Sequence, residues 1–589
     1  MGTLTEILRN FFLMMLAPLG AAMFGMFVAK MKLLEKFRNR IDRWHSYAGY
    51  LFKCVLCLAG WPLIIVALVY MHPFFGWLLK RKFNPAIFGF EILDLFDFFL
   101  RAAILWGIAA VYYLMLWPRI EKYAPKWRIP KPKSLRKGRI RHAEVYDIAI
   151  IGGGVTGTAQ AYVFSKFLKG VSKILLVEKN QDVALVNSNT GSNAQTLHGG
   201  DTETNFSLEK ALKMRDAELV FSAFLERYGT EGEAFRRLFK AAFGVGRTEE
   251  KIIKERFAMI SSYYPTLRLL GREELKALLP MLLEGRDPRI PVAALFRPNG
   301  YAVNYHKAAQ CLLREAEKTG KVNFLSSTKT RKIRKVGDLF EIYTNEGVFK
   351  ARAVASAAGP YSLLFAHDLG YASDYTILPV AGSFYRTKAV NFNGKVYTVQ
   401  DPMFPFAAAH MDSSVDNPEE MRIGPTADVI PLLERYHLAT FIDFLRTGII
   451  TPKGLRAIIK IFLNVRILLF AGRNLIYKIP IVGKWYFLKK GARKIIPTLK
   501  YGDIEYAKGE GGIRPQLVNM RERKLEMGTG KVAGDKIIFD ITPSPGASDC
   551  LRNALINAKK HFAGFLDVEF DSELFRKEFP EAAEVLEHI

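Results

Sequence analysis

A glycine-rich turn between two apolar runs constrains this 589-residue chain more than any other feature. Residues 147–160 read DIAIIGGGVTGTAQ, so an apolar run leads directly into Gly152-x-Gly154-x-x-Gly157. A helix-compatible segment at 158–169 and a second apolar run follow, and that run ends in Glu178. The first glycine permits a tight turn, the second lets the backbone approach a pyrophosphate, and the third lets helix and strand pack closely. Because an acidic residue at the end of the second strand suits a ribose hydroxyl, the sequence predicts a dinucleotide-binding domain.

Length, charge and cysteine content limit the remaining possibilities. A chain of 589 residues is too long for one hydrophobic core, so two or three domains are expected. The formal net charge of +27 is typical of proteins that bind nucleic acid or an anionic membrane. The basic residues lie beside apolar stretches, which favours the membrane and argues against a nucleic-acid partner. Four cysteines form neither a disulfide framework nor a zinc-binding spacing, so we expect a reducing compartment and no metal site.

Three apolar segments precede the glycine motif: residues 11–29, 54–79 and 102–117. A transmembrane helix needs about 20 apolar residues, which the first two segments supply. The third is shorter, and it either spans with help from an amphipathic lead-in at 87–100 or lies at the interface. We therefore expect residues 1–118 to form an α-helical membrane anchor of about three transmembrane helices. Residues 119–144 are basic and punctuated by proline, which indicates a stiff linker on anionic lipid.

Lysine and arginine residues in the loops orient this anchor. Six basic residues follow the first apolar segment between 30 and 43, and ten follow the third between 119 and 141. The connection between the second and third segments holds three basic residues offset by three acidic ones. Cytoplasmic loops carry the excess of lysine and arginine. We therefore expect a multi-pass protein of the inner (cytoplasmic) membrane, with everything after residue 118 in the cytoplasm.

Further polar and glycine-rich segments lie after the glycine motif. A long loop at 187–205 contains His198, and a buried strand runs into a glycine turn at 351–362. Near the end of the chain, Gly512-x-Arg514-Pro precedes a segment, residues 544–548, that reads SPGAS and opens a helix. Long ordered loops beside a nucleotide site are usually functional.

Together these motifs resemble the FAD-dependent family of D-amino-acid oxidase and glycerol-3-phosphate dehydrogenase. Within that family, residues 193–205, 404–410 and 422–426 are most similar to malate:quinone oxidoreductases and to the neighbouring L-2-hydroxyglutarate dehydrogenases. The resemblance extends from 146 to about 565, with one gap. It implies an α/β fold in which a Rossmann-type FAD-binding domain is combined with a mixed-sheet substrate domain. The membrane anchor is a departure from this group, although it suits a quinone acceptor.

The resemblance also implies which residues form the site. The FAD-binding parts would lie at about 145–205, 345–365 and 500–565, within an oxidoreductase unit at 145–589. The substrate domain would lie between these parts. The implied cofactor-binding residues are Gly152, Gly154, Gly157, Glu178, Ser192, Thr196, Gly359, Gly546 and Ser548.

Oxidation of a 2-hydroxy acid requires a base for the hydroxyl proton and cations for the carboxylates. His198 and His410 are the candidate bases, because a histidine accepts a proton near neutral pH. Arg514 and Arg422 are the candidate clamps, because a guanidinium binds a carboxylate with two hydrogen bonds. Structural hydrogen bonding or surface ion pairing is the alternative for each of these four residues, and the sequence leaves open which histidine is the base.

The gap in the resemblance, residues 435–499, interleaves apolar residues with lysine and arginine. No uncharged run in it reaches the length of a membrane span. This composition is typical of helices that lie in the membrane interface. An ordinary basic cap on the substrate domain is the alternative.

The implied function is a membrane-bound flavoprotein of the respiratory chain and the tricarboxylic acid cycle. It would oxidise L-malate to oxaloacetate by hydride transfer to FAD and pass the electrons to membrane quinone, as a malate dehydrogenase (quinone) does. One alternative is the same chemistry on L-2-hydroxyglutarate or glycerol 3-phosphate. The other is a membrane flavoprotein subunit without catalytic activity.

Overall fold

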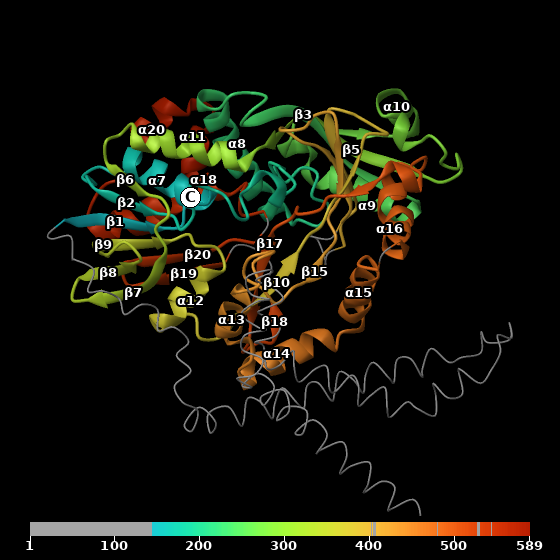
Figure 1. Cartoon of the computed structure of the whole chain (residues 1–589). Coiled ribbons are helices and arrows are strands. Elements are labelled where there is room, and N and C mark those ends of the chain that lie inside the picture. The colour runs from blue at the N-terminus through green and yellow to red at the C-terminus, as the bar shows by residue number, and fades with distance from the viewer. Residues whose placement is uncertain (1–143, 402, 404–407, 480, 527–529, 544) are drawn as a thin grey trace, which may run out of the picture. The chain divides into compact units, whose positions relative to one another are not determined.

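The computed structural model describes residues 144–589 except 402, 404–407, 480, 527–529 and 544 (Figure 1). The expected membrane anchor at 1–118, and all of the expected linker except residue 144, lie outside the described residues. Within the described part of the chain, no helix is both long and apolar enough to cross a membrane.

The glycine motif follows the central strand of a parallel sheet. This sheet has the strand order β19-β20-β9-β1-β2-β6. Its strands are β1 (Val145–Ile151), β2 (Ile174–Val177), β6 (Val322–Leu325), β9 (Val348–Ser356), β19 (Gly530–Gly534) and β20 (Ile537–Ile541). All neighbouring pairs are parallel except β19 and β20. β2 is buried along its whole length because both faces of the sheet are covered, which explains its continuous apolar run.

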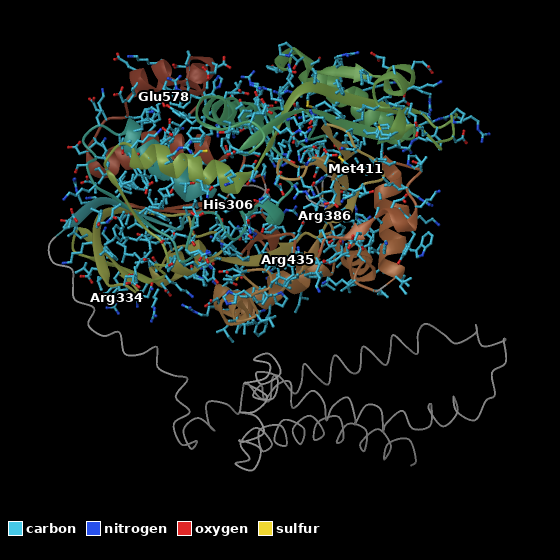
Figure 2. The ribbon with its side chains drawn as sticks, turned by 45° about the horizontal axis from the view of Figure 1, so that its top comes forward. His306, Arg334, Arg386, Met411, Arg435 and Glu578 are labelled. Atoms are coloured by element: carbon cyan, nitrogen blue, oxygen red, sulfur yellow. The ribbon has the colours of Figure 1, made fainter. Side chains whose placement is uncertain are left out.

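Helices cover one face of this sheet, and a hairpin covers the other (Figure 1). The helices are α7 (Val155–Phe167), α8 (Leu208–Tyr228), α11 (Tyr305–Glu317), α18 (Cys550–Asn557) and α20 (Ser572–Glu578). The opposite face carries β7 (Thr330–Val336), β8 (Leu339–Thr344) and α12 (Tyr361–Asp368). Figure 2 shows Glu578 among the helices and Arg334 on the hairpin, on opposite sides of the sheet. The largest hydrophobic cluster joins α7, α11 and α18, which explains why α7 is buried almost completely.

Two further sheets form the second part of the fold. The larger has the order β16-β11-β14-β13-β12-β3-β5-β4, and the smaller has the order β15-β10-β17-β18. The larger sheet is mixed, because β3 (Phe235–Val245) pairs parallel with β12 (Gly394–Thr398) and antiparallel with β5 (Val292–Val303).

The remaining strands of these two sheets are β4 (Arg268–Leu270), β10 (Tyr375–Ala381), β11 (Tyr385–Thr387), β13 (His410–Ser413), β14 (Met421–Gly424), β15 (Asp428–Val429), β16 (Glu505–Tyr506), β17 (Ile513–Asn519) and β18 (Lys524–Leu525). Helices α9 (Arg247–Ile260) and α10 (Arg272–Leu278) pack against β5. In the segment 500–565, β19, β20 and α18 belong to the parallel-sheet layer, whereas β16 and β17 belong to the other two sheets.

Residues 435–499, which we call the insert, form a layer of short helices beside both of these sheets. They are α13 (Thr440–Phe444), α14 (Pro452–Phe462), α15 (Val465–Ile476), α16 (Val482–Phe487) and α17 (Arg493–Ile495), with π-helical turns at Leu445–Ile449 and Leu488–Ala492. Ala457 and Ile461 of α14 pack with Leu378, Val380 and Val518 of the smaller sheet. The side chains of Phe487 and Leu488 join the core of the larger sheet. The insert is therefore an ordered part of the fold.

Candidate active site

One continuous cavity of about 340 Å³ begins at the glycine motif and ends beside the two further sheets. Segments far apart in the sequence meet in its wall. They include residues from 151–156, 177–196, 357–361, 397–410, 512–516 and 542–548. The carboxyl ends of β1 and β2 open into it, which is where open α/β sheets bind their ligands.

The three motif glycines have three different geometries. Gly152 has a φ of +105°, and a Cβ there would lie 2.6 Å from the carbonyl oxygen of Ala357. A Cβ on Gly157 would lie 1.8 Å from the carbonyl oxygen of Gly152, so the helix packs directly on the turn. At Gly154, which lines the cavity, a Cβ would meet only the Ser188 Oγ, at 3.6 Å. The turn is therefore closed on its packed side and open toward the cavity.

Glu178, the residue predicted to bind the ribose, directly follows β2. Glu178 is 7% exposed and lines the cavity. Its Oε2 accepts a hydrogen bond from the Gly153 amide at 2.7 Å, and its Oε1 accepts two from Asn180. These bonds fix the carboxylate beside the glycine turn, where it retains lone pairs for a ribose hydroxyl.

The other end of the cavity is built from two loops that are tied together. Ser548 accepts a hydrogen bond from the His198 amide at 3.0 Å and donates one to the Thr196 carbonyl at 3.1 Å. Ser192 and Gly546 line the same wall. Gly359 also lines it, with a φ of +58° and open space where a Cβ would stand.

The cavity thus fits FAD. Eight of the nine cofactor-binding residues predicted from the sequence line it, and Gly157 packs behind the turn instead. Gly154 and Gly359 both leave bare backbone in the cavity wall, where a pyrophosphate can approach. The Rossmann-type residues would hold the nucleotide half, and the wall around Ser192, Thr196, Gly546 and Ser548 would hold the flavin.

Both candidate bases lie in the cavity wall, in different surroundings. The Nδ1 of His198 hydrogen-bonds to the Oε1 of Glu203 at 2.6 Å. The side chain of His198 is 21% exposed. Glu203 is buried, so it fixes the orientation of the imidazole.

His410 is the more deeply buried histidine. Its Nδ1 lies 2.7 Å from the Oδ2 of Asp412, but the two atoms are not aligned as a hydrogen bond, and both are buried without a hydrogen-bond partner. Burial lowers the pKa of His410; the Asp412 carboxylate opposes this, while Lys395 and Arg514 reinforce it. His410 is therefore neutral at physiological pH, as a general base must be.

Arg514 on β17 faces the cavity without a counter-ion. Its Nη1 is buried and has no hydrogen-bond partner, and no carboxylate of the described residues lies within ion-pair distance. Burial, reinforced by the charge of Arg435, lowers the pKa of Arg514 to about 10. Buried charges are normally paired, so this guanidinium indicates a site for an anion.

Arg422 lies behind the cavity wall. It is 4% exposed and stands opposite Asp412 across the β13–β14 pair. Its guanidinium lies 5.5 Å above the ring of Phe384, which does line the cavity. The Nε and Nη2 atoms of Arg422 have no hydrogen-bond partner. His198, His410 and Arg514 therefore line the same cavity, whereas Arg422 is not among the residues that line it.

Several residues of the site were not predicted as functional. Asp412 follows His410 by two positions, and because side chains alternate along a strand, this spacing was a signal that the two share a face. Lys395 is fully buried, donates a hydrogen bond to the Ala194 carbonyl at 2.6 Å and lies 3.6 Å from Asp412. Burial lowers the pKa of Lys395 to about 8. Tyr397, whose hydroxyl donates to Thr196 Oγ1, likewise carried no signal in the sequence.

Comparisons with known proteins agree with this geometry. The sequence matches the family model described as FAD dependent oxidoreductase over residues 147–528. A probable malate:quinone oxidoreductase of Campylobacter jejuni is 35% identical over 445 residues, which cover 74% of this chain and 98% of that protein. The malate:quinone oxidoreductase of Helicobacter pylori is 36% identical over 454 residues, which cover 74% and 99%.

Among solved structures, glycine oxidase from Geobacillus kaustophilus shares the fold, with a TM-score of 0.50 at 16% identity over 71% of this chain and 94% of that chain. The family match begins at Asp147, in the strand that precedes the glycine motif, and covers more than half of the chain. The chain therefore belongs to the family of FAD-dependent oxidoreductases, and its cofactor is FAD.

Proposed function

We propose that this protein oxidises L-malate to oxaloacetate and passes the electrons to a membrane quinone. The observation that carries the proposal is Arg514 in the cavity wall, whose buried Nη1 has no hydrogen-bond partner and whose guanidinium has no carboxylate partner among the described residues. A substrate carboxylate is the partner that this geometry lacks, since a guanidinium binds it with two charge-assisted hydrogen bonds. The printed names of the two relatives add malate and quinone to this carboxylate.

His410 acts as the base in this proposal. Its imidazole is neutral because it is buried, and Arg514 lies close enough to affect its pKa. A 2-hydroxy acid held by Arg514 would present its hydroxyl to the same part of the wall, and His410 would take the hydroxyl proton. When bound, FAD supplies the acceptor for the hydride that leaves the substrate carbon.

Asp412 and Lys395 position the base without lining the cavity. Burial raises the pKa of Asp412, but its interactions with His410, Lys395 and Arg422 outweigh this effect and lower the pKa below its ordinary value, so Asp412 is ionised. Its carboxylate stabilises the proton that His410 gains. Lys395 donates a hydrogen bond to the carbonyl of Ala194, which lines the cavity, and so ties this group to the loop at 187–205.

The proposal includes the membrane. Residues 1–118 would anchor the protein in the inner membrane through about three helices, followed by a basic linker at 119–144. The oxidoreductase unit would face the cytoplasm. Support for this part is the apolar and charge pattern of the sequence.

The test is spectroscopic. The full chain is purified in mild detergent, its visible spectrum is recorded, and L-malate is added anaerobically. Bleaching of the oxidised-flavin band, reversed by a quinone analogue, is the expected result. A band that malate leaves unchanged would reject malate, and L-2-hydroxyglutarate and glycerol 3-phosphate would be tried next. Bleaching that quinone does not reverse would reject the acceptor.

A further inference from the structure

The insert exposes apolar side chains on a scale found nowhere else in the described residues. Sixteen of the 24 exposed large apolar side chains of the described residues lie between Tyr436 and Trp485. The most exposed on α14 and α15 are Ile459, Leu463, Val465, Leu468, Leu469 and Leu475, each between 57% and 75% exposed. Large contiguous apolar surfaces of this kind mark sites of interaction.

These side chains form an outer face that is distinct from the packed inner face. On α14, Ala457 and Ile461 are buried against the smaller sheet, while Ile459 and Leu463 point outward. On α15, the buried Asn474 accepts a hydrogen bond from the Ala427 amide at 2.8 Å, so the inner side is fixed. A helix that is apolar on both sides requires a partner on both sides. The inner partner is the smaller sheet, whereas no described residue covers the outer side.

The charge around this face indicates what the partner is. Residues 436–499 contain twelve lysine and arginine residues and a single carboxylate, Asp443. Arg456, Lys460, Lys489 and Lys490 are exposed and have no ion-pair partner among the described residues. Apolar side chains interleaved with lysine and arginine are typical of helices that lie in the headgroup region of anionic lipid.

Other occupants fit the charge less well. A second copy of this face would bring like charges together, which opposes association. Basic residues also outnumber acidic ones in residues 1–143, so that part of the chain has no net negative charge to complement the insert.

We propose that the outer face of α14 and α15 docks onto the surface of an anionic lipid bilayer. The helices have 11 and 12 residues, so they lie along the interface and do not cross it. Docking here is a second membrane contact, separate from the expected anchor. This proposal rests on the proposed quinone-linked function. Leu433 and Glu434, immediately before the insert, line the cavity. Docking of the insert would therefore bring the cavity close to the lipid-soluble acceptor.

The test uses an environment-sensitive fluorophore on the full chain. Cys54 and Cys57 are replaced by serine, and Cys311 and Cys550 are buried, so a new cysteine is labelled selectively. Nitrobenzoxadiazole is attached at Leu468→Cys or, as the matched control, at Val336→Cys. Val336 is 53% exposed and lies on β7, outside the insert. The protein is reconstituted into phosphatidylglycerol–phosphatidylcholine vesicles and into phosphatidylcholine vesicles.

In the anionic vesicles we expect doxyl-labelled lipid to quench the label at 468 several-fold more than the label at 336, and iodide to quench it less. We expect this difference to shrink in phosphatidylcholine vesicles and in the Arg456→Glu, Lys460→Glu variant. Equal quenching at the two positions would overturn the proposal. A label at 468 that is shielded from both quenchers would also overturn it, because protein would then cover the face.

Flavin bleaching by L-malate is recorded on the same samples, so the two proposals fail separately. Bleaching without lipid quenching rejects the docking surface alone. Lipid quenching without bleaching rejects malate and keeps the docking surface.

Discussion

Two regions of this protein leave groups without partners, and they do so in opposite ways. The cavity wall holds buried polar atoms, Arg514 Nη1 and His410 Nδ1, that have no hydrogen-bond partner among the described residues. The insert leaves apolar groups bare on the outside, as at Leu468 and Leu469. Each arrangement costs free energy unless a partner is supplied, and the nature of the bare group identifies that partner. The bare polar groups of the cavity suit a small anion, and the bare apolar groups of the insert suit an apolar medium. The following variants test this comparison.

Replacement of His410 should have the largest effect. For His410→Gln we expect the rate of flavin reduction by malate to fall about 10²- to 10⁴-fold, because proton acceptance by a positioned base contributes that much. Stopped-flow absorbance measures this rate. His561→Gln, outside the cavity wall, is the control and should react like the native protein. If His198→Gln loses more than His410→Gln, the role of base belongs to His198.

Replacement of Arg514 should separate function from stability. For Arg514→Met we expect kcat/KM for malate to fall between about 30-fold and several thousand-fold, because truncating one partner of a buried charge pair costs about 2–5 kcal/mol. The same variant should melt at a higher temperature without malate, because an unpaired buried charge has been removed. Arg514→Lys should restore part of the activity, since it keeps the charge but loses the planar fork. A drop in both properties would contradict the assigned role.

Gly154→Ala should weaken FAD binding while leaving the fold intact. The added Cβ has space within the protein, at 3.6 Å from Ser188 Oγ, but it intrudes on the side that faces the cofactor. Overpacking of about 1–3 kcal/mol corresponds to affinity that is roughly 5- to 150-fold weaker. Calorimetric titration of the apoprotein with FAD measures it. Gly271→Ala, which has open space and lies outside the cavity, is the control.

A paired change on the insert should have a smaller and more selective effect. For Leu468→Ser with Leu469→Ser we expect quinone-linked turnover in vesicles to fall several-fold, while oxidation of malate with a soluble dye stays unchanged. The free energy of unfolding in detergent should change little, since exposed positions usually contribute less than about 0.5 kcal/mol. Val336→Ser serves as the control. Equal loss with both acceptors would show that the outer face supports the fold and not the acceptor.

The smallest expected effect is a shift in pH dependence. Because burial lowers the pKa of His410 below its ordinary 6.5, kcat/KM should be constant above that value and fall as the pH drops through the lowered pKa. Asp412 opposes this lowering. Asp412→Asn should therefore move the acidic limb of the profile to still lower pH. A shift toward higher pH would show that Asp412 does not act on His410.

Local sequence predicted much of the nucleotide-binding half. The glycine motif, the strands before and after it and the acidic residue are all local features, and each lies where its spacing implied. Helix α8 begins at Leu208 because the side chain of Ser207 caps its first turn. The helix expected over 158–169 begins earlier, at Val155, since Gly154 is still extended and the chain turns into the helix directly after it. These elements depend on neighbours in the chain.

The rest of the site depends on contacts between distant residues. Arg422 was predicted as a substrate clamp, but the pairing of β13 with β14 places it opposite Asp412, and no local pattern fixes that register. Lys395 reaches Ala194 across 201 positions of the chain. The burial that shifts the pKa of His410 also comes from several segments together. Residue types alone therefore indicated the chemistry of the cavity wall, but not which side chains line the cavity and which lie behind them.

Glu434, immediately before the insert, and Arg435, its first residue, determine how the insert could be exchanged between proteins. Glu434 lines the cavity and forms an ion pair with Lys179, which directly follows Glu178. Arg435, labelled in Figure 2, donates to the Gly382 carbonyl and to Ser383 Oγ, the latter at 2.6 Å. A chimaera that borrows a relative's surface helices must keep these two residues and join the new segment after them. The outer helices could then be replaced, while the wall of the cofactor cavity stays unchanged.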